Sequence, residues 1–134
     1  MVMNMTNPLL NAYVNVCFRL SEQDLADWRG DTAVIITAWN PRSVRLAQSQ
    51  NHQRNHDLKS DLDHFRMFKL LVGNENFDWF EESYWVDISL KGGLTLAEKY
   101  QQNAIYWVDK KQVFLVYSVD KQLIYIGEID DFLP

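Results

Sequence analysis

The chain lacks the features that mark secreted, membrane-spanning and nucleotide-binding proteins. It contains one cysteine, Cys17, so it forms no internal disulfide, and nothing in it favours an oxidising compartment. Its five glycines form no phosphate-binding loop. No apolar run approaches the ~20 residues that cross a bilayer. We therefore expect a soluble, cytoplasmic protein with no membrane partner and no cofactor.

Charge and length narrow the class further. Eighteen acidic residues outnumber 13 basic ones, for a net charge of −5, and this balance would repel a phosphate backbone. We therefore do not expect a nucleic-acid partner. Hydrophobic residues make up 47% of the chain and aromatic residues 13%, which is typical of a well-packed globular protein. At 134 residues, the chain is long enough for one domain with a substantial core.

We expect this single domain to span residues 1–134, with a loose N-terminal lead at 1–10 and a core at 11–129. Residues 130–134 form a tail that continues a mixture of acids and apolar side chains beginning at Glu128. Such a tail is either a docking segment or an end packed on the sheet. An end packed on the sheet is the commoner of the two.

Alternating and continuous apolar patterns predict the strands. Residues 12–20 alternate with a period of two, and residues 33–39 are apolar on both faces except at Thr37, which is typical of a central strand. Short gaps near Lys110 and Lys121 predict antiparallel hairpins at the C-terminal end. The remaining predicted strands cover residues 67–72, 79–88, 104–108, 113–119 and 123–129.

Helical patterns complete the fold. Residues 43–65 predict a long helix, and Thr95 with Glu98 forms a capping-box signature for a short helix that ends near Gln102. Ser21 is a plausible cap for a shorter connection. The sequence thus predicts an α+β domain with an antiparallel or mixed sheet of about six or seven strands, two main helices and a C-terminal β-meander.

The sequence predicts that several polar side chains lie close together where the central strand, residues 33–39, ends. Asn51 and Asn55 fall on the core-facing stripe of the long helix, together with apolar Leu58 and Leu62. Asparagine is costly to bury without hydrogen-bond partners. The nearest partner in the pattern is the turn at Asn40, so we expect these amides to meet there.

Alternation along residues 79–88 places Glu82 on one face with Tyr84, where it is the lone acid on an apolar face. Burial would raise the pKa of this carboxyl and make it a candidate general acid or base. Glu81 falls on the other face with Trp79 and Trp85, where we expect a solvated residue.

These motifs resemble a known family. The resemblance spans roughly residues 13–108 and rests on Thr37 to Pro41, on Asn51 and Asn55, on Trp79 with residues 81–83, and on residues 102–105. The family is the bacterial domain-of-unknown-function family 3293. The resemblance implies a small cytoplasmic α+β domain and no assigned activity. This chain has Arg42 and Ser43 where a glycine often follows the Asn-Pro pair, and Asp87 where another glycine tends to stand.

Two function classes follow from these residues. In the first, a pocket binds a small polar molecule, Glu82 acts as acid or base, and the other site residues are Asn40, Asn51, Asn55, Gln102 and Arg42. In the second, the amides are purely structural and the domain is an acidic interaction module or inhibitor that uses Trp79 and Trp85 on a protein partner.

Two further alternatives involve ions. Free N–H groups at residues 40–43, beside Arg42 and Arg45, would suit an anion, although no glycine-rich cradle is present. His52 and His56 have the i, i+4 spacing of metal ligands, but no third ligand is indicated for this pair. We therefore predict no metal site.

Overall fold

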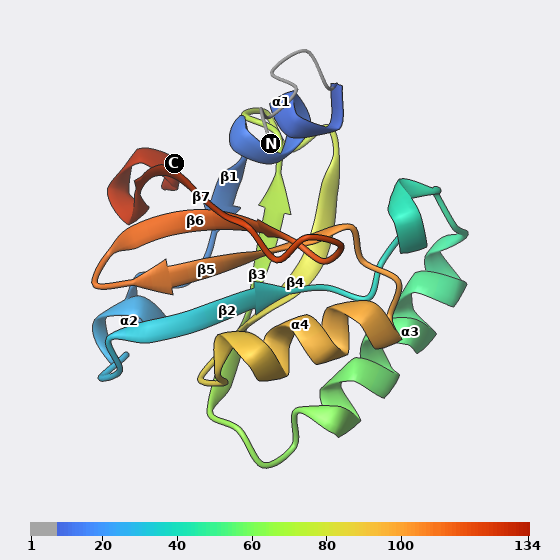
Figure 1. The fold of residues 1–134 in the computed structure, drawn as a ribbon, viewed down its shortest axis with the longest axis horizontal. Helices are drawn as coiled ribbons and strands as arrows, with labels where there is room; N and C mark the ends of the chain where they lie inside the picture. Colours follow the sequence, from blue (N-terminus) through green and yellow to red (C-terminus); the bar gives the residue numbers. More distant parts are fainter. Residues whose placement is uncertain (1–7) are drawn as a thin grey trace.

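The structure, a computed structural model, describes residues 8–134. These residues form seven strands, four α-helices and two short 3-10 helices (Figure 1). The elements are α1 (Pro8–Val14), β1 (Cys17–Arg19), α2 (Glu22–Ala26), β2 (Thr32–Ile36), η1 (Pro41–Ser43), α3 (Gln48–Asp61), β3 (Met67–Gly73), β4 (Phe80–Val86), α4 (Leu90–Lys99), β5 (Ala104–Asp109), β6 (Gln112–Tyr117), β7 (Leu123–Glu128) and η2 (Ile129–Phe132).

One antiparallel sheet holds the strands in the order β1-β3-β4-β2-β5-β6-β7. The strand β2 lies in the middle, as its apolar sequence predicts. Ala33, Val34, Ile35 and Ile36 are all buried, because β4 and β5 flank the strand and side chains cover both of its faces. The predicted α+β class and sheet are confirmed.

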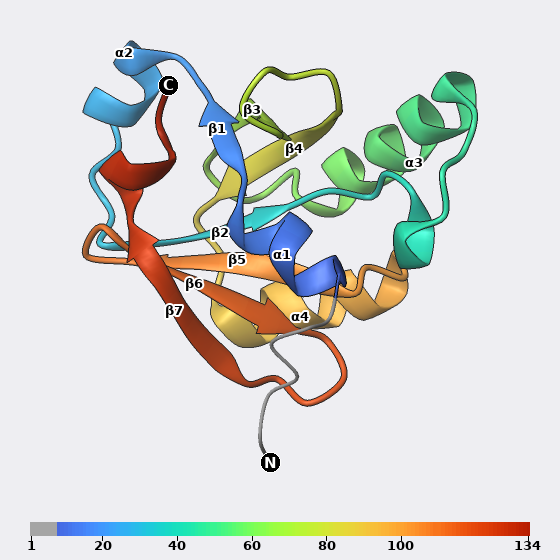
Figure 2. The same cartoon turned by 90° about the horizontal axis from the view of Figure 1, so that it is seen from above.

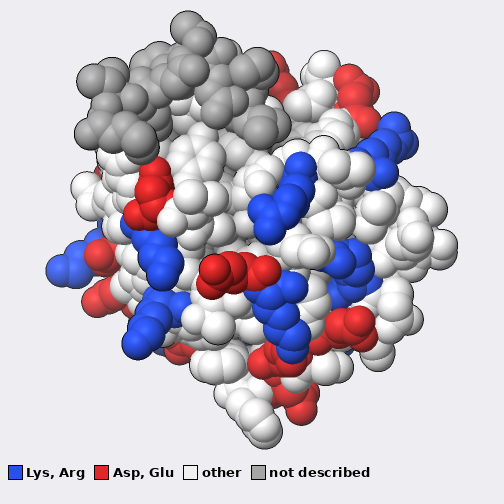
Figure 3. Space-filling view, turned by 45° about the vertical axis from the view of Figure 1, so that its right-hand side comes forward, with Lys and Arg blue, Asp and Glu red and all other residues white. Residues whose placement is uncertain are grey.

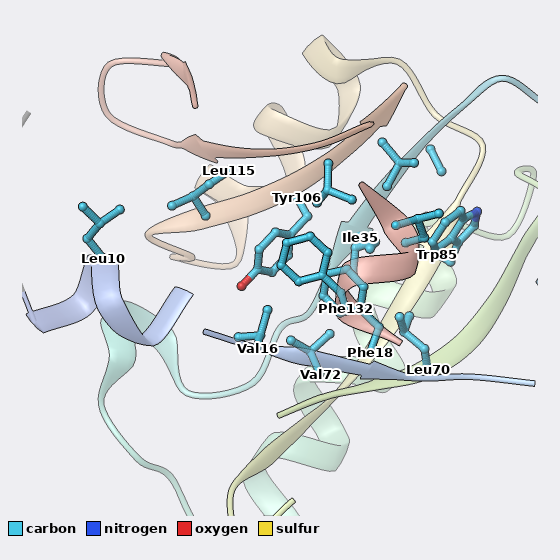
Figure 4. Close-up of a cluster of buried hydrophobic side chains, with 14 residues drawn as sticks. Leu10, Val16, Phe18, Ile35, Leu70, Val72, Trp85, Tyr106, Leu115 and Phe132 are labelled. Carbon is cyan, nitrogen blue, oxygen red and sulfur yellow. The ribbon is translucent and has the colours of Figure 1, made fainter. Parts of the chain in front are cut away.

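The sheet curls into a half-barrel, so it has a concave and a convex face (Figure 2). On the concave face, Ile35 and Trp85 belong to one buried cluster with Leu10 of α1 and Phe132 of η2. The close-up shows Ile35 and Phe132 near the middle of this cluster, with Leu10 and Trp85 at opposite ends (Figure 4). The convex face is covered by α3 and α4, whose buried apolar side chains are Leu58, Leu94 and Ala97. The domain therefore has one core on each side of its sheet.

The predicted first strand over residues 12–20 is wrong in its first half. Residues 8–14 form α1, and β1 covers only Cys17–Arg19. Leu10, Tyr13 and Val14 follow the i, i+3, i+4 spacing of a helix, and all three pack against the concave core. The Tyr106 hydroxyl donates to the Tyr13 carbonyl at 2.7 Å and so satisfies an orphan group near the end of α1.

The predicted lead at 1–10 falls mainly on residues 1–7, outside the described residues. Its last part, from Pro8 to Leu10, belongs to α1. At the other end of the chain, Phe132 is 4% exposed and stacks on Phe18 with ring centroids 5.3 Å apart. The C-terminal segment is therefore an end packed on the concave core.

Helix α4 begins earlier than its predicted capping box. The Ser89 side chain accepts a hydrogen bond from the Gly92 N–H at 3.0 Å, so the helix starts at Leu90 and includes the predicted glycine loop. A Cβ on Gly93 would lie 2.8 Å from Cγ2 of Val34. This glycine therefore allows α4 to approach β2 closely, which outweighs its poor helix propensity.

The predicted C-terminal meander is confirmed as β5, β6 and β7. Lys110 and Lys111 both have positive φ angles, 49° and 71°, and join β5 to β6 in a two-residue hairpin. This is the backbone geometry that matches the right-handed twist of paired strands. Across residues 8–134, no helix combines the length and the apolar character that crossing a membrane requires.

Candidate functional site

The loop that follows β2 turns sharply at Asn40. Its φ angle is 48°, in the left-handed region that asparagine tolerates better than most residues. The Asn40 N–H donates to Oδ1 of Asn51 at 2.9 Å, and Nδ2 of Asn51 donates back to Oδ1 of Asn40, also at 2.9 Å. Oδ1 of Asn40 also accepts from the Leu46 N–H at 3.0 Å. The predicted meeting of Asn51 with the Asn40 turn is present.

The same carboxamide reaches the sheet. Nδ2 of Asn40 donates to Oε2 of Glu81 at 2.9 Å. One side chain therefore connects the start of α3, through Asn51, with the start of β4. Other hydrogen bonds fix the side-chain oxygen and the backbone N–H of Asn40. Its side-chain Nδ2 group is therefore held in place toward the Glu81 carboxyl.

Asn55 bonds mainly to the backbone, and its Oδ1 also accepts from the Thr37 hydroxyl at 3.5 Å. Its Oδ1 accepts from the Ala38 N–H at 2.8 Å, and its Nδ2 donates to the Glu82 carbonyl at 2.8 Å. It is 4% exposed. This residue ties α3 to both β2 and β4, and both ends of its carboxamide are occupied by main-chain partners, so its role in the site is architectural.

Two other side chains fix the same loop from the α4 end. Nε2 of Gln102 donates to the Trp39 carbonyl at 2.9 Å and to the Tyr100 carbonyl at 3.2 Å. Nε of Arg54 donates to the Ala38 carbonyl at 2.7 Å, and its NH2 group donates to the Tyr100 carbonyl. Arg54 is not among the predicted site residues, because it lies between the two asparagines on α3 but off the stripe that they share.

A cavity of about 640 Å³ opens beside this loop, on the concave side of the sheet. That size is typical of small-molecule sites. Ile35, Val72 and Tyr106 belong to the concave core and provide part of its lining. The polar lining includes Tyr13, Asn40, Ser43, Asn51, Glu81, Ser83 and Gln102.

Glu81 is the acid of this cavity. Burial raises its pKa from 4.5 to about 7, and the hydrogen bond from Asn40 offsets part of that rise. A carboxyl with a pKa near neutrality holds its proton in about half of the molecules at pH 7. Both the donor and the acceptor form of the group are therefore available to a ligand at that pH.

Glu82 lies on the opposite face of β4, with Tyr84 as predicted. Its side chain is 42% exposed, and its Oε2 lies 3.9 Å from Nε2 of His52 on α3. The expected burial of Glu82 is wrong, because the side chain that lies beside it on α3 is the 51% exposed His52 and both groups remain in contact with solvent. The expectation that Glu81 is solvated is wrong for the complementary reason that its face borders the cavity.

Arg42 is exposed and lies outside the cavity lining. Its N–H donates to the Gln101 carbonyl at 2.7 Å, while the Ser43 and Val44 N–H groups donate to the carbonyls of Asn40 and Pro41. The N–H groups on which the anion alternative depends are therefore occupied. Among residues 8–134, no three His, Cys, Asp or Glu side chains converge as metal ligands.

The two tryptophans proposed for a partner surface differ in exposure. Trp85 is 2% exposed and stacks on Phe68 at a centroid distance of 5.4 Å, so it belongs to the concave core. Trp79 is 44% exposed, and Phe80 beside it is 39% exposed. On the face shown in Figure 3, acidic and basic side chains are interspersed.

Fold and site together define a small antiparallel α+β domain with a ligand-sized cavity at the end of its central strand. The chain belongs to the family described as protein of unknown function (DUF3293), whose model matches residues 36–105. The matched residues include the loop at Asn40, both asparagines of α3, Glu81 and Gln102. No curated protein and no solved structure matches the chain.

Proposed function

We propose that this domain binds a small polar molecule in the cavity beside Asn40, with Glu81 as the ionisable group that contacts it. The observation that carries the proposal is the Glu81 carboxyl, which lines the cavity and is oriented by Asn40 at 2.9 Å. A purely structural network has no need of this acid, because Asn55, Gln102 and Arg54 already hold the loop through main-chain partners.

The environment of Glu81 also suits acid or base chemistry on a bound molecule. A general acid or base works best when its pKa lies near the operating pH, and burial raises the pKa of Glu81 to about 7. In this proposal, Asn40 fixes the carboxyl, and Asn51 holds Asn40 in its left-handed turn. The proposal moves the acid or base role from Glu82 to Glu81 and leaves Asn55 as a support.

Native mass spectrometry of the protein purified gently from the cytosol of its host tests the proposal. We expect a reproducible added mass in the wild type and in Glu82→Gln, and its loss in Glu81→Gln. Glu82→Gln is a matched control, because the same chemical change is made one residue away on the other face of β4. A bare wild-type chain, or full retention in Glu81→Gln, contradicts the proposal.

A protein-interaction function is the second candidate, and one observation favours it. Trp79 and Phe80 are exposed side by side, next to the exposed acid Asp78. Exposed aromatic residues beside polar ones are typical of interface centres. We define Asp78, Trp79 and Phe80 as the rim patch. All three residues also border the cavity, so the two candidates are separated by substitutions inside it.

A further inference from the structure

We propose that the ligand of this cavity carries a cationic nitrogen, an ammonium or amidinium group, for which the Glu81 carboxylate is the counter-ion and the aromatic walls complete the binding surface. This inference rests on the proposed function and names its ligand class. Three features of the cavity carry it.

The first feature is a carboxyl without a basic partner. The ion pairs among residues 8–134 join His52 to Glu82 and Lys99 to Asp61, and neither includes Glu81. Its hydrogen bond comes from the neutral amide of Asn40. A buried carboxylate that lacks a counter-ion is unfavourable in the free protein, and a cationic ligand would remove that cost on binding.

The second feature is the aromatic lining. The faces of tyrosine and tryptophan rings attract cations, and the attraction is stronger where the contact is shielded from water. A carboxylate among aromatic rings therefore favours an organic cation over an anion or a neutral polar molecule. The aromatic residues that line the cavity are Tyr13, Trp39, Trp79, Phe80 and Tyr106.

The third feature is the balance of the other charges. Arg45 and Asp78 line the cavity at exposed positions, where solvent and salt screen them, and their charges oppose each other. The field of Glu81 reaches the buried Tyr106: burial is the main cause of the raised pKa of Tyr106, and the charges of Tyr13, Glu81 and Tyr117 add to it. Among the charged residues of the cavity lining, Glu81 is therefore the one that is not exposed.

Binding of a cation should favour the ionised form of Glu81 and release its proton. Because the pKa of this group is raised to about 7, affinity should rise with pH up to neutrality and then level off. The ionised fraction is about one-tenth at pH 6 and about nine-tenths at pH 8, so we expect roughly tenfold tighter binding at pH 8. Tyr106, whose pKa is raised by burial, stays neutral over this range.

Isothermal titration calorimetry with three probes of similar shape tests the inference. The probes are 2-phenylethylammonium, 2-phenylethanol and 3-phenylpropionate, which are cationic, neutral and anionic. At pH 8 we expect the cation to bind at least tenfold more tightly than the other two. Glu81→Gln should remove this preference, whereas Glu82→Gln should keep it. Cooperative thermal unfolding of Glu81→Gln would show that its cavity is still framed by a folded protein.

The outcomes separate this inference from the proposed function. Equal binding of all three probes, or a cation preference that survives Glu81→Gln, overturns the cationic class but leaves a ligand cavity. Binding of none of the probes also overturns the inference, and the proposed function is then decided by the mass retained from the cytosol. A tenfold preference that depends on both Glu81 and pH supports it.

Discussion

The two faces of β4 carry neighbouring glutamates in different environments. Glu82 lies on the convex face, near His52 and solvent, whereas Glu81 lies on the concave face in a cavity, with its pKa raised to about 7. On the convex side, both the oxygen and the nitrogen of the Asn55 carboxamide form hydrogen bonds with main-chain groups. The Asn40 carboxamide instead donates one hydrogen bond to Glu81, the acid that lines the cavity. Similar residue types thus stabilise the fold on one face of the strand and line a cavity on the other.

The largest expected effect tests the convex side. Asn55→Ala should lower the free energy of unfolding by about 4 kcal/mol, because the Ala38 N–H would lose its partner in a dry environment and the Glu82 carbonyl would keep only the Thr37 hydroxyl. Urea denaturation followed by circular dichroism measures this change. Asn76→Ala, at an exposed turn position, is the control and should change stability by less than about 0.5 kcal/mol. A loss below about 1 kcal/mol would remove the architectural role of Asn55.

The pH dependence of stability distinguishes the two glutamates. The folded-state pKa of Glu81 is raised from 4.5 to about 7, so the folded state binds more protons than the unfolded state between these values. Its contribution to stability is therefore fully present below about pH 4.5 and is lost as pH rises through 7. We expect this loss to reach roughly 3 kcal/mol at pH 8.

Glu81→Gln should remove that pH dependence and be more stable than the wild type at pH 8, since an uncharged amide replaces a buried carboxylate. Glu82→Gln should follow the wild-type profile. Denaturant midpoints measured from pH 4 to pH 8 for the three proteins check both statements. Identical profiles for wild type and Glu81→Gln would show that Glu81 ionises freely.

A smaller effect is expected for Asn51, whose partner group lies beside the cavity. Asn51→Ala should lower the free energy of unfolding by about 1–2 kcal/mol, because water entering the cavity can replace part of its bonding to Asn40. Ligand retention should nevertheless fall, since Asn40 would lose the contact that holds its turn. Urea denaturation and native mass spectrometry on one sample separate the two effects. A loss of stability as large as that of Asn55→Ala would show that Asn51 and Asn55 contribute equally to stability.

The smallest expected effect concerns the rim patch. Trp79→Ala should change the free energy of unfolding by less than about 0.5 kcal/mol, because its side chain is 44% exposed. If the rim patch binds a protein, this substitution should weaken capture of that partner at an unchanged melting temperature. Undiminished capture would exclude Trp79 from the interface, and Val119→Ala, at a 90% exposed position, is the surface control.

Much of the arrangement of strands and helices around the cavity could be predicted from the sequence. The period of two along β4 correctly separates Glu81 from Glu82, and the helical stripe correctly buries Asn51, Asn55, Leu58 and Leu62. These features are local, because strand and helix geometry alone decide which residues share a face. Where a strand runs through the apolar centre of the sheet, as β2 does, the pattern also predicts its place in the fold.

Other features depend on how distant elements pack. Alternation cannot decide which face of β4 borders a cavity, since that depends on where α1 and α3 end relative to the strand. It also cannot distinguish a helix from a strand in residues 12–14, whose apolar side chains fit both periods. The start of α4 was missed because Gly93 is a poor helix former, and its benefit appears only where Val34 approaches it.

The stacking of Phe132 on Phe18 has a consequence for folding kinetics. These rings come from opposite ends of the sequence, so their contact closes one of the largest loops that the chain can form. Loop-closure entropy makes such a contact unfavourable until most other contacts exist, so the half-barrel should close late in folding. Until then, the apolar concave face is open to solvent and to other chains, and the docking of η2 is the step that covers it.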